Sequence, residues 1–84
     1  MKYCIITFRS VTPAQRGEEA LRRAGVSCSL GRTPKWMEEQ GCGYSLRVAH
    51  LDAPNAVELL RGKQIPMRKV YLLRDNGAAE ELSL

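Results

Sequence analysis

The pattern of hydrophobic and polar positions along the chain predicts four strands and two helices. Residues 2–8 (KYCIITF) form a nearly continuous apolar and β-branched run, which is typical of a central strand covered on both faces. Residues 26–30 and 44–50 alternate between apolar and polar positions with a period of two, which predicts strands with one buried face. A last strand is expected at residues 67–73.

Each predicted helix follows the first strand of a pair. The first helix has Thr12 as its N-cap, Pro13 at its first position and Gln15 completing a capping box, and it ends at Gly25 in a left-handed cap. Its apolar stripe consists of small residues that let a helix lie close to a sheet: Gly17, Ala20, Leu21 and Ala24. The second helix covers residues 53–62.

The order strand, helix, strand, strand, helix, strand indicates an α+β domain of two interleaved βαβ units. Right-handed crossovers then give the ferredoxin-like βαββαβ sandwich, a four-stranded antiparallel sheet in the order 4-1-3-2 with two helices on one face. We expect a single domain over residues 1–74 and a polar C-terminal tail, residues 75–84, that is loose or adds one helical turn.

The direction of the strands determines where the loop before residue 44 lies. We expect the first and third strands to run parallel and side by side, which puts this loop near the C-termini of both helices. Helix dipoles at that end would oppose a thiolate.

The sheet face opposite the helices is expected to be apolar. The outward-facing set consists of Tyr3 and Ile5, or else Cys4 and Ile6, together with Tyr71 and Leu73. An apolar patch of this kind is typical of a homodimer interface or of a docking surface for another protein.

Composition and charge exclude several classes of function. The 84 residues carry 13 Lys and Arg against 9 Asp and Glu, a net charge of +4, and the basic residues are scattered, so we do not expect a nucleic-acid ligand. The segment GYSLRV at residues 43–48 lacks the further aromatic residues of the RNA-binding pattern that it faintly matches. No apolar stretch suits a signal peptide or a membrane span, so we expect a cytoplasmic protein with free thiols.

The chain contains three cysteines, Cys4, Cys28 and Cys42, and a single histidine, His50. Cys4 and Cys28 lie on predicted strands and are interpreted as small core residues. His50 ends the third strand at the opposite end from Cys42, which argues against a Cys–His catalytic pair. These scattered residues lack the spacing of a metal site, and we expect neither a metal nor a cofactor.

Cys42 lies between Gly41 and Gly43 in a polar loop. Glycines on both sides leave a thiol unobstructed, and the N–H groups of such a turn, with nearby cations, can lower the pKa of the thiol. Upstream lie three residues suited to stabilising a thiolate or docking a partner: Arg32, Lys35 and Trp36. The residues alone leave open whether Cys42 is reactive or only part of a turn.

The motifs around this loop occur together in a fixed order. The chain contains the strand YCIITFRS, the helix end LRRAGV, a loop with Pro34, then CGYSLRV and the helix NAVELL. This arrangement resembles a family of short bacterial domains of unknown function described as Se/S carrier protein-like. The resemblance covers about residues 2–72, and its most specific part is the Cys-Gly pair at 42–43; Gly41 and the insertion KWMEEQ depart from the usual pattern.

The resemblance implies a sulfur or selenium carrier more than a stand-alone enzyme. Cys42 would accept the atom as a persulfide or selenosulfide, and a partner such as a cysteine desulfurase or a selenium-metabolism protein would supply the catalytic groups. The alternative is a non-catalytic ferredoxin-like module that binds a protein or small ligand, or dimerises, with Cys42 only a turn residue.

Overall fold

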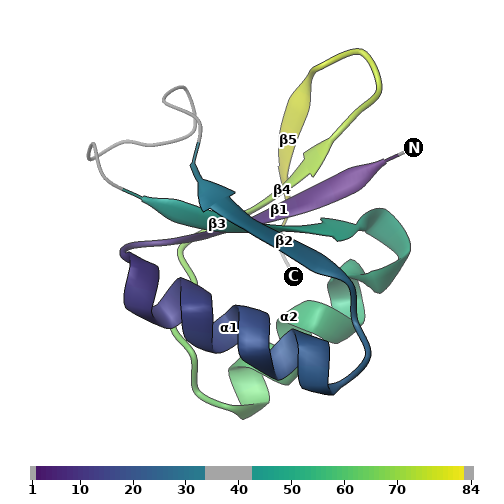
Figure 1. Ribbon diagram of the computed structural model, residues 1–84. Coiled ribbons are helices and arrows are strands. Elements are labelled where there is room, and N and C mark those ends of the chain that lie inside the picture. Colours follow the sequence, from purple (N-terminus) through teal and green to yellow (C-terminus); the bar gives the residue numbers. More distant parts are fainter. Residues whose placement is uncertain (1, 34–42, 83–84) are drawn as a thin grey trace.

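The computed structural model of the chain describes residues 2–33 and 43–82. The elements are, in order, β1 (Tyr3–Phe8), α1 (Val11–Arg23), β2 (Cys28–Arg32), β3 (Tyr44–Ala49), the 3-10 helix η2 (His50–Asp52), α2 (Ala53–Gly62), β4 (Val70–Leu73) and β5 (Ala79–Leu82). Helices α1 and α2 cover the same face of the sheet (Figure 1). The α+β class and the placement of the two helices on one face are therefore confirmed.

In the part of the chain that the structure describes, the sheet has five strands in the order β2-β3-β1-β4-β5, and every neighbouring pair is antiparallel. The four expected strands keep the neighbours of the order 4-1-3-2. The expectation of a four-stranded sheet was wrong, because β5 pairs with the outer edge of β4. The fold is thus a ferredoxin-like arrangement with one added edge strand.

The expectation that the first and third strands run parallel was also wrong. Strands β1 and β3 are antiparallel, with Phe8 opposite Tyr44 and Tyr3 opposite Ala49. A crossover helix makes only the two strands of its own βαβ unit parallel. The strand inserted between them belongs to the other unit and runs in the opposite direction.

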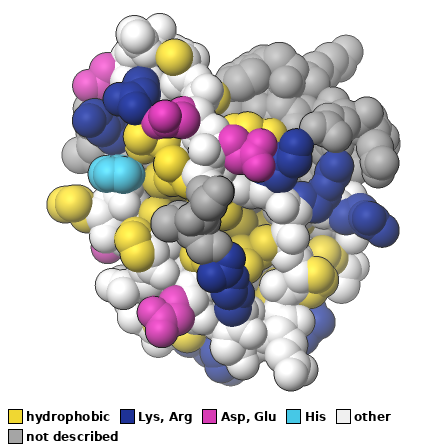
Figure 2. Space-filling view, turned by 180° about the vertical axis from the view of Figure 1, so that it is seen from behind, with side chains coloured by type: hydrophobic (Ala, Val, Ile, Leu, Met, Phe, Trp, Pro, Cys, Tyr) yellow, Lys and Arg dark blue, Asp and Glu magenta, His cyan; other side chains and the backbone are white. Residues whose placement is uncertain are grey.

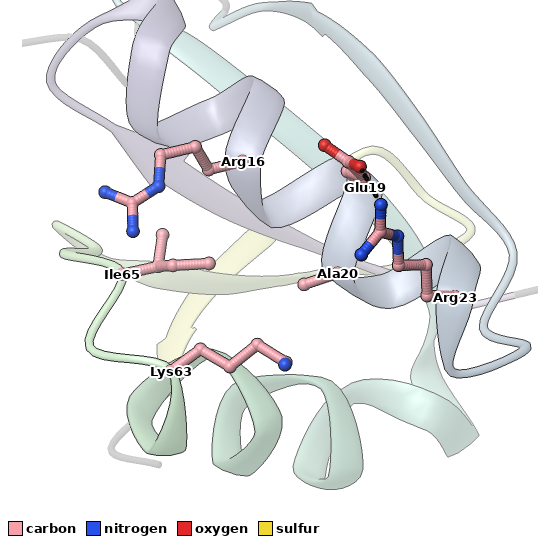
Figure 3. A pocket seen from close by; sticks show the side chains of 6 residues that line it. All are labelled: Arg16, Glu19, Ala20, Arg23, Lys63 and Ile65. Atoms are coloured by element: carbon pink, nitrogen blue, oxygen red, sulfur yellow. Dashed lines mark ion pairs between the residues drawn. The ribbon is translucent and has the colours of Figure 1, made fainter.

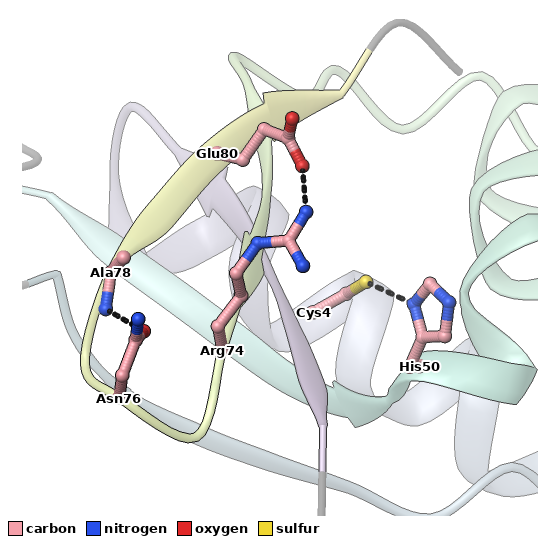
Figure 4. A network of polar contacts seen from close by, with 6 residues as sticks. All are labelled: Cys4, His50, Arg74, Asn76, Ala78 and Glu80. Carbon is pink, nitrogen blue, oxygen red and sulfur yellow. Dashed lines mark hydrogen bonds and ion pairs between the residues drawn. The ribbon is translucent and has the colours of Figure 1, made fainter.

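Strand β5 and β4 form a hairpin at the C-terminal edge. The Arg74 N–H donates to the Ala78 carbonyl at 2.8 Å, Gly77 takes φ +87°, and the Arg74 side chain donates to Glu80 at 2.8 Å (Figure 4). The expected loose tail or helical turn was therefore wrong for residues 79–82. The segment AEEL has little intrinsic strand preference, and its pairing depends on the free edge of β4.

The hydrophobic core lies between the sheet and the two helices. Alternate residues of the strands point into it, and they include Cys4, Ile6, Phe8, Leu46, Val48, Val70 and Leu72. Gly17 marks the close approach of α1, since a Cβ there would lie 3.2 Å from Leu46 Cδ1 and 3.3 Å from Phe8 Cζ. The small-residue stripe is confirmed at Gly17, while Ala24, expected in the same stripe, is exposed.

The ends of α1 differ in how well the sequence predicted them. The helix begins at Val11, and Ser10 at the N-cap position makes no side-chain capping hydrogen bond. The predicted capping box with Thr12 as N-cap was wrong, because Thr12 lies inside the helix. Gly25 has φ +83°, as its role in a left-handed cap requires.

The sheet face opposite the helices carries the Tyr3 and Ile5 phase of β1, one of the two alternatives expected. Residues on this face are less exposed than an open sheet suggests: Ile5 is 8% exposed, and Tyr3, Tyr71 and Leu73 are half-buried. The Arg47 guanidinium covers the Tyr3 ring at 5.1 Å from its centre. A homodimer through this face stays a prediction.

Candidate functional site

The ends of β2 and β3 form the base of the loop that carries the candidate cysteine. Arg32 and Tyr44 are opposite each other, and the Arg32 guanidinium lies 5.7 Å from the centre of the Tyr44 ring, within reach of a cation–π contact. The Thr33 N–H donates to the Gly43 carbonyl at 3.0 Å. The structure thus brings Arg32 and Gly43 to the same place, with Arg32 exposed and Gly43 buried.

Four of the candidate residues lie outside the described part of the chain: Lys35, Trp36, Gly41 and Cys42. Their assigned roles in thiolate stabilisation, docking, loop geometry and chalcogen acceptance stay predictions.

The electrostatic setting of the loop base differs from the one expected. Because Tyr44 is opposite Phe8, the loop begins and ends beside the end of β1, where α1 starts. Helix α2 begins at the other end of the sheet, after β3, and only its C-terminus returns to this end. The expectation that both helix dipoles oppose a thiolate was wrong, since the positive N-terminal end of α1 lies here.

The loop base also contains a buried hydroxyl group, that of Thr33. Thr33 is 8% exposed, and its Oγ1 has no hydrogen-bond partner among the described residues. A buried hydroxyl without a partner costs about 1–3 kcal/mol of stability. The burial of this residue was not predicted from the sequence.

The thiols of Cys4 and Cys28 are free and poorly placed for nucleophilic chemistry. Cys4 is fully buried in the core, and burial raises the pKa of its thiol. Burial also raises the pKa of the half-buried Cys28 thiol, the nearby charge of Glu18 adds to that effect, and the charge and hydrogen bond of Arg22 oppose it in part. Because the thiolate is the nucleophilic form, a raised pKa favours the less reactive thiol form of both side chains near neutral pH. The interpretation of Cys4 as a core residue is confirmed, and Cys28 packs against the edge of the same core.

Cys4 also contacts the only histidine of the chain, a pairing that the sequence did not suggest. The Cys4 Sγ lies 3.6 Å from the His50 Nδ1, a hydrogen-bonding distance for sulfur (Figure 4). Val48 is opposite Cys4 in the antiparallel register, which brings the residue just after the end of β3 close to it. The sulfur is fully buried while His50 is exposed, so the contact does not present a nucleophile to a substrate.

Within residues 2–33 and 43–82, no group of three or more His, Cys, Asp or Glu side chains is arranged to hold a metal ion. No helix in these ranges has the length and apolar character needed to cross a membrane.

Comparison with known proteins adds one match. A family model described as putative Se/S carrier protein-like matches residues 3–72, which includes every element from β1 to most of β4. No curated protein and no solved structure matches the chain.

Proposed function

Because the chain belongs to the putative Se/S carrier protein-like family, we propose that it carries a sulfur or selenium atom on Cys42. The observation that carries this proposal is the state of the other two thiols. Cys4 is fully buried, Cys28 is half-buried, and burial raises the pKa of both. A carrier needs one accessible thiolate, and Cys42 is the remaining cysteine of the sequence.

The loading step is a thiol–persulfide exchange. The Cys42 thiolate attacks the terminal sulfur of a persulfide on the donor protein, and a new sulfur–sulfur bond forms on Cys42. The donor's own sulfur–sulfur bond breaks, and the donor leaves as a thiolate. The exchange needs no external oxidant or reductant, and the selenium version gives a selenosulfide by the same route.

The described residues at the base of the loop support the proposal of an anionic sulfur on Cys42. Arg32 places an exposed guanidinium at the base of the loop, and the N-terminal end of α1 lies at the same end of the sheet. Both features stabilise negative charge. The hydrogen bond from Thr33 to Gly43 fixes the two ends of the loop relative to each other.

The partner that fits this chemistry is a cysteine desulfurase or a protein of selenium metabolism. Such an enzyme generates the chalcogen in an activated form and supplies the acid–base groups of the transfer. A small carrier with one nucleophile then needs no base or oxyanion hole of its own.

Alkylation of the native protein tests whether Cys42 is the accessible thiol. We expect iodoacetamide to label Cys42 well before Cys28 and Cys4. Peptide mass spectrometry measures the rate of labelling at each cysteine. Unfolding in urea should bring the three rates together, because burial causes the difference. Labelling of Cys28 or Cys4 at the rate of Cys42 in the native protein would contradict the proposal.

Transfer itself is tested with a cysteine desulfurase and free cysteine. The wild-type chain should gain the mass of one sulfur atom, mapped to Cys42 and removed by a reducing agent. Cys42→Ser should gain none, while the matched control Cys28→Ser should be loaded like the wild type. Sulfur loading of Cys42→Ser to the same extent as the wild type would refute the proposal.

A further inference from the structure

A hollow of about 550 Å³ lies at the start of α1 and is lined by three arginines: Arg9, Arg16 and Arg68. We call it the arginine pocket. Its other lining residues include the hydroxyl side chains of Ser10 and Thr12 and the apolar side chain of Met67.

The three arginines come from three segments that the fold brings together. Arg9 directly follows β1, Arg16 lies in the middle of α1, and Arg68 precedes β4. The backbone at Thr7 fixes two of these segments, since its carbonyl accepts from the Arg68 N–H at 2.8 Å and its N–H donates to the Lys69 carbonyl at 2.8 Å. The pocket is therefore a product of the tertiary structure and not of a local run of basic residues.

The arginine pocket carries an excess of positive charge. No acidic residue is among its lining residues, and the first turn of α1 has none. Among the described residues, Arg9 and Arg16 form no ion pair, whereas Arg22, Arg23 and Arg74 each pair with a glutamate. On the face that Figure 2 shows, several Lys and Arg side chains gather on the side away from the histidine, and a smaller group lies close to it. Repulsion between neighbouring positive charges raises the free energy of the folded protein, and a bound anion reduces that repulsion.

A neighbouring hollow is less suitable for binding an anion. It lies between α1 and the end of α2, and Arg16 lines it together with Lys63, Ile65 and Arg23 (Figure 3). Here Glu19 also lines the wall and pairs with Arg23 at 2.7 Å, which neutralises part of the positive charge. The arginine pocket has no such carboxylate in its lining.

The chemistry of the lining indicates the class of ligand. Guanidinium groups bind phosphate oxygens with paired hydrogen bonds, and hydroxyl groups add further donors. The volume falls in the range of pockets for small organic molecules, and Met67 lies in the wall with Pro13 and Pro66. We propose that the arginine pocket binds a small organic phosphate, with its phosphate group on Arg9 and Arg16 and its apolar body against Met67.

This site does not depend on Cys42, so the two proposals succeed or fail separately. In the test, the full chain is titrated with phenyl phosphate and with inorganic phosphate at constant ionic strength. Changes in the amide chemical shifts, measured by NMR, report the binding. Both should bind saturably, with shifts concentrated at residues 9–12, 14–16, 67 and 68, since Pro13 and Pro66 have no amide proton. Phenyl phosphate should bind more tightly, because its ring adds contact with Met67.

Variants separate the pocket from general charge effects. Arg16→Gln should weaken phenyl phosphate binding about tenfold, the size expected for loss of a charge-assisted hydrogen bond. Arg23→Gln is the matched control, since it removes the same charge from the same helix outside the pocket, and it should leave the affinity within about twofold. Met67→Ala should weaken phenyl phosphate about fivefold and leave inorganic phosphate unchanged.

Three results would overturn the assignment. The first is the absence of saturable binding by either phosphate. The second is that Arg16→Gln and Arg23→Gln weaken phenyl phosphate binding equally, in variants whose circular dichroism matches the wild type. Net charge alone would then explain the effect. The third is a single-stranded oligoribonucleotide that shifts the same amides at lower concentration than phenyl phosphate.

Discussion

Replacing Gly17 with alanine tests how closely α1 lies against the sheet. The new methyl group would lie 3.2 Å from Leu46 Cδ1, 3.3 Å from Phe8 Cζ and 3.4 Å from Leu60 Cδ2. All three neighbours are fully buried, so none of them can move into solvent to make room. An extra methyl in a well-packed core costs about 1–3 kcal/mol. Alanine in place of glycine inside a helix gains about 1 kcal/mol. We therefore expect Gly17→Ala to lower the free energy of unfolding by about 1 kcal/mol.

Gly62→Ala provides the matched control. Gly62 is the last residue of α2, its φ is not positive, and a Cβ there would meet no atom within 4 Å. This substitution should raise the free energy of unfolding by about 0.5–1 kcal/mol through the unfolded chain and the helix preference. Because that gain enters both variants, the difference between them, about 1–3 kcal/mol, measures the packing cost at Gly17.

Urea unfolding followed by circular dichroism measures both changes. The midpoint should move while the slope m stays constant, which shows that stability alone has changed. Thermal scans should agree, since 1 kcal/mol corresponds to about 4–8 °C in a domain of this size. If Gly17→Ala proved as stable as Gly62→Ala, the close approach of α1 to Leu46 and Phe8 would be refuted.

Two further predictions concern buried polar groups. Thr33→Val should raise the free energy of unfolding by about 1 kcal/mol, because it removes a buried hydroxyl that has no partner among the described residues. Thr7→Val should instead lower it by about 1–3 kcal/mol, because Thr7 Oγ1 accepts from the Lys69 N–H at 3.0 Å and donates to the Lys69 carbonyl at 3.2 Å. Changes of the same sign in urea unfolding would contradict this account. Burial raises the pKa of the Cys4 thiol, so the folded state keeps that proton to higher pH; the stability it contributes is complete below the ordinary pKa of a thiol and is lost as the pH rises through the raised pKa of the folded state. The stability advantage of the wild type over Cys4→Ala should therefore shrink between pH 7 and pH 10, and an advantage independent of pH would argue against it.

The sequence predicted the local elements well where one periodicity dominated a segment. The apolar run of β1, the alternation of β3 and the small-residue stripe of α1 all identify their elements, and the patterns of β3 and α1 also identify a buried face. The phase of β1 could not be chosen, because a strand that is apolar on both faces carries no signal for the side that meets the helices. Strand β5 was missed for a different reason, because its four residues carry little strand preference and pair only with the edge of β4.

The sequence predicted the candidate residues of the site but not their surroundings in the fold. The sequence singled out Cys42 by its glycine neighbours and by the family resemblance, and it identified Cys4 as a core residue. It did not predict the direction of β3 relative to β1, and so it placed the loop at the wrong end of the helices. It also gave no signal for the arginine pocket or for the contact of Cys4 with His50, which lie 46 residues apart in the chain.

What the sequence determined by itself is the four strands and two helices of the βαββαβ order and the identity of the chemically distinct residues, because these depend on interactions between near neighbours in the chain. Only the tertiary structure decided which ends of these elements meet. Strand direction, edge pairing and the convergence of Arg9, Arg16 and Arg68 depend on contacts between distant segments, and those contacts form only when the sheet and helices bury a common core.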